Sequence, residues 1–165
     1  DRWFEMATDS PTIDGGARGV IAGNNPTSNV IQFFTIPIQG NATDFGDLSQ
    51  NRFVGGSGSS RTRGIFMGGD PGPSGRLDDI DFITIASTGN ATDFGDLTSG
   101  SYSQLRGLSN SIRGCFGGGY ISPAETNIIH FITIASTGNS TDFGDLTDAR
   151  YGPAPFSDAH GGLGD

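Results

Sequence analysis

A nine-residue motif that recurs at a fixed spacing constrains the fold of this chain more than any other feature. Its three copies read Gly-Asn-Ala/Ser-Thr-Asp-Phe-Gly-Asp-Leu and span residues 40–48, 89–97 and 138–146, so successive copies lie 49 residues apart. A motif kept at a period of this length indicates an internal repeat, whose units bury their apolar faces against one another. The chain is therefore expected to be an array of similar supersecondary units.

Each unit is expected to consist of about four short strands. Of the 165 residues 28 are Gly and 8 are Pro, and the apolar residues stand in short runs between turn formers, which is typical of an all-β protein. A short apolar run after Arg-Gly, expected to be buried on both faces, precedes a polar loop and a longer run rich in β-branched and aromatic residues. The copies of the short run are 17–23, 62–69 and 112–118. The copies of the longer run are 29–36, 79–85 and 127–134. Four strands in roughly 49 residues match one blade of a β-propeller.

The longer run of the second repeat predicts an irregularity in its strand. Apolar and polar residues alternate in 80–82, and they alternate again in the opposite phase in 83–85. A β-bulge, or a strand covered on both faces, would explain this change of phase.

The order of these elements is similar to the kelch repeat. Arg-Gly leads to Gly-Gly, a loop, an Asn or Asp before the apolar strand, an aromatic-x-x-Leu segment and an Arg, although the first Gly-Gly is reduced to Ala22-Gly23. In this resemblance Phe45, Phe94 and Phe143 stand where kelch blades carry a Trp, which implies that they pack between blades. The motif's leucines, Leu48, Leu97 and Leu146, are expected to be further anchors of the repeat.

Residues 83–98 also resemble, nearly letter for letter, the repeats of kelch-like arrays in predicted virion and tail-fibre proteins of phages of aquatic bacteria. The resemblance covers residues 17 to about 158. It implies a structural or adhesive component of a phage virion, on the surface of an extracellular particle, with other virion subunits, further copies of itself and host-surface glycans as partners. A stand-alone carbohydrate-binding module is the alternative, and a glycan-degrading enzyme is the second alternative.

The motif contains residue types that carry chemistry in other proteins. Its carboxylate pairs, which could act as acid and base or bind Ca²⁺, are Asp44/Asp47, Asp93/Asp96 and Asp142/Asp145. Three equivalent copies argue against an active site, and the same repetition, with the absence of any Lys, argues against reading Asp-Phe-Gly as a kinase motif. We therefore expect no enzyme and no cofactor, and Ca²⁺ at these carboxylates is a weak hypothesis. The structural interpretation pairs each carboxylate with a turn or with the recurring arginines Arg18, Arg63 and Arg113.

Other candidates are isolated. Asn41, Asn90 and Asn139 stand in Asn-x-Thr sequences, which serve a tight turn or accept a glycan. His130 takes the place of Gln32 and Asp81 in the other repeats, a changeable polar position that we expect to be exposed. Cys115 aligns with apolar residues and is expected to be buried, whereas His160 has no visible partner.

Charge excludes one class of partner. All nine basic residues are Arg, and with 18 acidic residues the net charge is −9, so the clustered positive charge that nucleic-acid binding needs is missing. Apolar runs fall short of the ~20 residues that span a bilayer, so membrane insertion is not expected. One Cys and two His also leave too few ligands for a typical zinc site.

The number of repeats leaves the closure of the fold open. The chain is read as one repeat-built domain with a partial repeat at 1–16, repeats at 17–61, 62–111 and 112–158, and a tail at 159–165. Asp1-Arg2-Trp3-Phe4 matches the segments after the motif, so the chain starts within a repeat. Propellers have about four to eight blades, and 165 residues make about 3.4 repeats. The chain is therefore a piece of a longer propeller, a ring completed by several chains, or a pseudo-threefold β-trefoil or β-prism.

Overall fold

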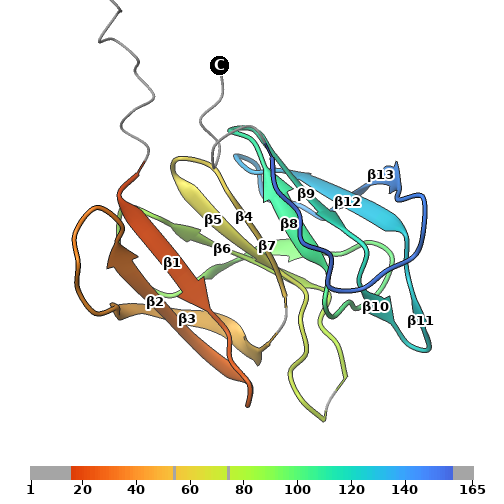
Figure 1. The fold of residues 1–165 in the computed structure, drawn as a ribbon, viewed down its shortest axis with the longest axis horizontal. Coiled ribbons are helices and arrows are strands. Elements are labelled where there is room, and N and C mark those ends of the chain that lie inside the picture. Colours follow the sequence, from red (N-terminus) through yellow and green to blue (C-terminus); the bar gives the residue numbers. More distant parts are fainter. Residues whose placement is uncertain (1–15, 54, 74, 158–165) are drawn as a thin grey trace, which may run out of the picture.

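The computed structural model describes residues 16–53, 55–73 and 75–157, which form three antiparallel sheets that fan out side by side (Figure 1). The first sheet has the order β1-β2-β3, from β1 (Arg18–Ala22), β2 (Ser28–Thr35) and β3 (Thr43–Arg52). The second has the order β4-β5-β6-β7, from β4 (Gly56–Ser59), β5 (Arg63–Met67), β6 (Asp79–Thr84) and β7 (Thr92–Asp96). The third has the order β13-β12-β9-β8, from β8 (Arg106–Ser109), β9 (Arg113–Gly117), β12 (Ile128–Thr133) and β13 (Thr141–Asp145). A small hairpin of β10 (Tyr120–Ile121) and β11 (Ala124–Glu125) extends from the third sheet.

Each sheet is a meander, and the first strands of the second and third sheets, β4 and β8, lie against each other. The hydroxyl of Ser109 on β8 donates to the carbonyl of Ser59 on β4 at 2.8 Å, and the backbone N–H of Ser59 donates to the same hydroxyl at 3.0 Å. The sheets are thus blades arranged around a common centre. The predicted all-β propeller architecture is confirmed, and the described residues do not form the alternative β-trefoil or β-prism.

Blades and sequence repeats are offset by one strand. β4 belongs to the sequence repeat 17–61, but it pairs with β5 and is therefore part of the second blade. In the same way, β8 belongs to the repeat 62–111 but pairs with β9 in the third blade. The innermost strand of each blade therefore comes directly after the outermost strand of the preceding blade. This connection links successive blades at the centre of the fan.

The hydrophobic core lies mainly between blades. The cluster between the first and second blades is Ile31, Phe45, Leu48 and Ile83, and the cluster between the second and third is Ile65, Met67, Ile80, Phe94, Leu97, Tyr102, Leu105, Phe116, Ile132 and Ile134. Each blade therefore depends on its neighbours for burial, as expected in a repeat array. The Arg-Gly strands were predicted to be buried on both faces, and this prediction is wrong for β1. Ile21 on β1 is exposed, because no described blade covers that face of the first blade.

Candidate functional site

The Asp-Phe-Gly part of the motif forms the same β-bulge in every blade. In the second blade Ile80 pairs with Gly95 and Asp81 pairs with Asp93, so Phe94 is left without a partner on β6. Phe45 and Phe143 are the unpaired residues at the equivalent register shifts in the other blades. A bulge and a strand covered on both faces were the two explanations for the change of phase in 80–85. The structure has a bulge opposite Ile80 and Asp81, but its extra residue lies on β7 and not on β6. Ile80 and Asp81, which point to opposite faces of β6, are both buried, so this strand is also covered on both faces.

The bulge directs the phenylalanine toward the next blade. Phe45 and Phe94 are only 2% and 3% exposed, and each makes an edge-to-face contact with an aromatic ring of the neighbouring strand. Phe143 makes the same kind of contact with Phe131 but is 52% exposed, because no described blade follows the third. The leucines follow this order: Leu48 and Leu97 are buried and Leu146 is half-buried. Phe45, Leu48, Phe94 and Leu97 therefore lie between two described blades, whereas Phe143 and Leu146 lie on the outer face of the third blade.

The Gly-Asn-Ala/Ser end of the motif forms hydrogen bonds with the bulge of the preceding blade. The backbone N–H of Gly89 donates to the carbonyl of Phe45 at 2.7 Å, and that of Ala91 donates to the carbonyl of Asp47 at 2.8 Å. The backbone N–H of Asp47 in turn donates to Oδ1 of Asn90 at 3.1 Å. We call this contact, Gly-Asn-Ala/Ser of one motif against Phe-Gly-Asp of the preceding motif, the interblade clasp.

The junction between the second and third blades repeats the interblade clasp. The backbone N–H of Gly138 donates to the carbonyl of Phe94 at 2.7 Å, and that of Ser140 donates to the carbonyl of Asp96 at 2.8 Å. The backbone N–H of Asp96 in turn donates to Oδ1 of Asn139 at 3.0 Å. Interpreting the asparagines as turn residues was incomplete, because the side chains of Asn90 and Asn139 accept hydrogen bonds from the preceding blade. The sequence motif is thus the contact by which one blade holds the next.

Glycine is required at the centre of the interblade clasp. A Cβ on Gly46 would lie 2.4 Å from the carbonyl oxygen of Gly89, and one on Gly95 would lie 2.5 Å from the carbonyl of Gly138. The φ angles of Gly46 and Gly95 are also positive, at 146° and 143°. Backbone approach and backbone conformation therefore both exclude a side chain here.

The recurring arginines do not pair with the motif carboxylates, which corrects the expectation for Arg18, Arg63 and Arg113. The guanidinium of Arg18 lies 4.8 Å from the centre of the Phe33 ring and donates to the carbonyl of Ile85 in the next blade at 2.6 Å. Arg63 repeats this arrangement with the Phe82 ring at 4.5 Å and the carbonyl of Ile134 at 3.0 Å, and Arg113 lies over Phe131 at 4.7 Å. The register of the Arg-Gly strand places an aromatic ring beneath each guanidinium, so a cation–π contact replaces the ion pair.

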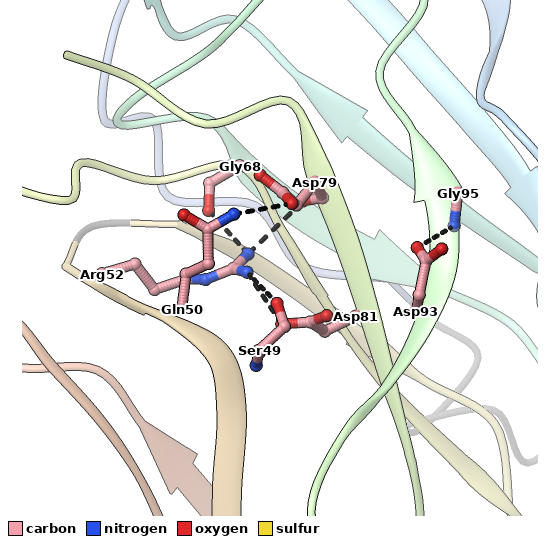
Figure 2. Close-up of polar contacts among 8 residues, drawn as sticks. All are labelled: Ser49, Gln50, Arg52, Gly68, Asp79, Asp81, Asp93 and Gly95. Atoms are coloured by element: carbon pink, nitrogen blue, oxygen red, sulfur yellow. Dashed lines mark hydrogen bonds and ion pairs between the residues drawn. The ribbon is translucent and has the colours of Figure 1, made fainter. Parts of the chain in front are cut away.

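The first carboxylate of the motif accepts a hydrogen bond within the bulge in the second and third blades. Oδ1 of Asp93 accepts the backbone N–H of Gly95 at 3.0 Å, and Oδ1 of Asp142 accepts that of Gly144 at 2.9 Å (Figure 2 shows the first pair). Partial desolvation, with nearby carboxylates, raises the pKa of Asp96 above its ordinary value. No group of three or more His, Cys, Asp or Glu side chains with metal-binding geometry occurs in the part of the chain that the structure describes. The Ca²⁺ hypothesis therefore gains no support from the arrangement of Asp44, Asp47, Asp93, Asp96, Asp142 and Asp145.

A buried ion pair joins the first two blades and was not predicted. Nη2 of Arg52 at the end of β3 lies 2.7 Å from Oδ2 of Asp81 on β6, and both side chains are almost fully buried (Figure 2). Ser49 donates to the same carboxylate oxygen from its hydroxyl at 2.8 Å, and Arg52 also donates to the carbonyl of Gly68 at 2.9 Å. Burial lowers the pKa of the Arg52 guanidinium, and the charge of Asp81 acts in the opposite direction. The sequence signal was the Arg that follows the motif in Asn51-Arg52-Phe53.

The expected exposure of His130 is wrong, because the side chain is completely buried. Its ring packs edge-on against Tyr102 with 4.9 Å between centroids, and Nδ1 lies 3.4 Å from the hydroxyl of Ser140. Gln32, Asp81 and His130 share a position that faces the preceding blade, and Gln32 is exposed because no described blade precedes the first. Sequence variation there reflects a different neighbour at each junction, not contact with solvent.

Cys115 is half-buried, not buried as expected, and burial raises the pKa of its thiol. It lines a cavity of about 230 Å³ between the third blade and the segment 153–155. His160 and the segment Asp1-Arg2-Trp3-Phe4 lie outside the described residues.

A larger cavity of about 360 Å³, which we call the central cup, lies where the innermost strands meet. Its lining includes Arg18 of the first blade, the serines Ser57, Ser59, Ser109 and Ser157, and Phe156, a residue that is 90% exposed. Sequence reasoning missed the central cup because its residues come from three blades and the segment after the third. Apart from the recurring Arg18, the polar and aromatic residues named here look like ordinary turn or linker residues in their own repeats.

Comparisons with known proteins support the architecture. No protein-family model and no curated protein matches the chain. Among solved structures, the chain is similar to that of YjhT, a kelch-repeat β-propeller, with a TM-score of 0.61 at 12% sequence identity over 74% of this chain. The match covers 40% of YjhT, so the chain spans about two fifths of that propeller. The described residues are therefore kelch-like propeller blades.

Proposed function

We propose that this protein is a structural and adhesive component of a phage virion that recognises a host-surface glycan at the central cup. The virion assignment rests on the resemblance of 83–98 to phage arrays. The structural role is supported by the interblade clasp, which uses the most repeated residues of the chain to hold blades together. Asp93 and Asp142, candidates for acid–base chemistry, accept backbone hydrogen bonds within the bulges.

The central cup carries the adhesive part of the proposal. A sugar ring offers apolar C–H surface on its faces and hydroxyl groups around its edge, so its sites combine an aromatic ring with hydrogen-bonding groups in a concave surface. Phe156 presents an exposed ring, and Ser57 and Arg18 add polar groups at the same cavity. Two serine hydroxyls, those of Ser109 and Ser157, are already engaged with backbone carbonyls and position the inner segments.

A glycan array tests the adhesive part. The wild-type protein is expected to bind a subset of bacterial surface glycans, and Phe156→Ala is expected to reduce that binding at least tenfold. Ile112→Ala is the matched control, since Ile112 is an exposed apolar side chain that does not line the central cup. Failure to bind any host-surface glycan, or equal loss in both variants, would reject recognition at the central cup.

The virion assignment has its own test. Antibodies raised against residues 16–157 are expected to label intact phage particles, and mass spectrometry of purified particles is expected to recover these peptides. A glycan-binding protein that is absent from particles would instead be a stand-alone carbohydrate-binding module, the alternative that the same central cup supports.

A further inference from the structure

We infer that the two outer faces of the three-blade array are complementary halves of the interblade clasp, and that a second copy of this chain closes the propeller. In this ring, Gly40, Asn41 and Ala42 of one copy dock on Phe143, Gly144 and Asp145 of the other. The inference rests on the geometry of the two internal junctions and not on glycan recognition.

The Gly-Asn-Ala half of the interblade clasp, residues Gly40, Asn41 and Ala42 of the first blade, has no preceding blade among the described residues. Ala42 is exposed, whereas its equivalents are half-buried in Ala91 and buried in Ser140, where each motif grips a preceding blade. Within the described ranges, no acceptor is found for the backbone N–H groups of Gly40 and Ala42. Ile36 is likewise 63% exposed, although its equivalent Ile134 is buried.

The third blade presents the gripped half. The ring of Phe143 is exposed, and a Cβ on Gly144 would meet nothing within 4 Å, whereas at Gly46 and Gly95 it would collide with the following motif. Arg113 stacks on Phe131 and Phe143, but among the described residues its guanidinium donates to no carbonyl of a following blade. The bulge and the arginine are thus in the conformation seen at the internal junctions.

The two free faces can reproduce the internal contacts one by one. By equivalence, the N–H of Gly40 would donate to the carbonyl of Phe143, and the N–H of Asp145 would donate to Oδ1 of Asn41. Two further bonds complete the set, from the N–H of Ala42 to the carbonyl of Asp145 and from the guanidinium of Arg113 to the carbonyl of Ile36. Both internal junctions have all four contacts. The same residue types occupy the same positions on the free faces.

The number of blades favours one additional copy. A head-to-tail contact repeats until the ring closes, and propellers close with about four to eight blades. Two copies of the three described blades give six blades, whereas three copies give nine, which is beyond that range.

The chain already enters the next blade at the centre of the ring. The hydroxyl of Ser157 donates to the carbonyl of Ser109 at 2.9 Å, just as the hydroxyl of Ser109 donates to the carbonyl of Ser59. The described segment 153–157 therefore lies against β8 much as β8 lies against β4, in the place that the innermost strand of a following blade would take.

Light scattering after size-exclusion chromatography tests the inference with the full 165-residue chain. The wild-type protein is expected to have twice the monomer mass of 17.1 kDa. Phe143→Asp, which places a charge on one free face, and Ala42→Asp, which places one on the other, are each expected to give monomers. Ala124→Asp, the same charge on the exposed β10–β11 hairpin, is the control and is expected to remain dimeric.

An equimolar mixture of the two monomeric variants provides a sharper test. A heterodimer of Phe143→Asp and Ala42→Asp has one junction in which both halves are wild-type, so mixing is expected to restore part of the dimer. A dimer formed through an unrelated surface would not depend on this complementation. Circular dichroism of each variant should match that of the wild type, which separates loss of the dimer from loss of the fold.

Hydrogen exchange provides a second measurement. The backbone N–H groups of Gly40 and Ala42 are expected to be protected in the wild-type dimer and to exchange at least tenfold faster in Phe143→Asp. A wild-type monomer at high micromolar concentration would overturn the inference, whether or not these amides were protected by other parts of the chain. A dimer that survives both face substitutions would also overturn it.

Discussion

The carbonyl of Phe94 accepts the backbone N–H of Gly138 at 2.7 Å, across the junction between the second and third blades. This bond joins the bulge of one motif to the beginning of the next motif, 44 residues later in the chain. It explains why the motif recurs as a unit, since its two ends must match the corresponding ends of copies in neighbouring blades. Substitutions at the junction should therefore affect the stability of the whole array.

Phe94→Ala is expected to lower the free energy of unfolding by ~3–5 kcal/mol, because the ring is almost fully buried between two blades. Chemical denaturation with fluorescence or circular dichroism measures this loss. Phe156→Ala removes an exposed ring and should cost less than ~0.5 kcal/mol. A loss below ~1 kcal/mol for Phe94→Ala would mean that the phenylalanine is not an interblade wedge.

Gly95→Ala and Gly144→Ala separate backbone strain from interblade contact. Both glycines have similar positive φ angles, 143° and 139°, so both substitutions should cost ~1–3 kcal/mol through strain. Only at Gly95 does the new Cβ also meet backbone of the following motif, which should add ~1–3 kcal/mol. Thermal unfolding, with both variants compared as monomers on the Phe143→Asp background, measures the difference. Equal losses would contradict a tight interblade contact at Gly95.

The fold was predictable because the strands are specified locally, whereas the junctions are not. The 49-residue period and the turn formers predicted the blades, whereas the change of phase in 80–85 left a bulge and a strand covered on both faces as alternatives. The contacts of His130 and Arg52 depend on which residues the preceding or following blade places opposite them. Each repeat meets a different neighbour, so aligning the repeats within one chain could not reveal these contacts. The central cup escaped prediction for a related reason, since no single repeat contains it.

Asp81→Ala should be among the most destabilising polar substitutions, because it leaves the Arg52 guanidinium buried without its counter-charge. The expected loss is ~3–5 kcal/mol, measured by denaturant unfolding. The double variant Arg52→Met with Asp81→Leu should lose much less, since no buried charge remains. A double-mutant cycle with the two single variants gives the coupling energy, and independent, additive losses would show that the pair does not act as a unit.

His130 should make the stability of the array sensitive to mild acid. Burial against Tyr102 lowers the pKa of His130 below its ordinary value of 6.5, although the charge of Asp142 opposes the shift. Between this lowered pKa and ~6.5, the unfolded chain binds more protons than the folded one, so the free energy of unfolding falls as the pH decreases. The contribution is fully present above the unfolded value and is lost toward acid.

The control for this pH dependence is His130→Gln, which introduces the residue that the first blade carries at the same position, Gln32. Denaturant unfolding is compared at about pH 7.5 and about pH 5.5, an interval above the ordinary pKa values of Asp and Glu. The wild-type protein is expected to lose more stability over this interval than His130→Gln, even if the variant is less stable at both pH values. Equal losses would mean that protonation of His130 is not linked to unfolding, and that its burial between the blades imposes no penalty on the charged form.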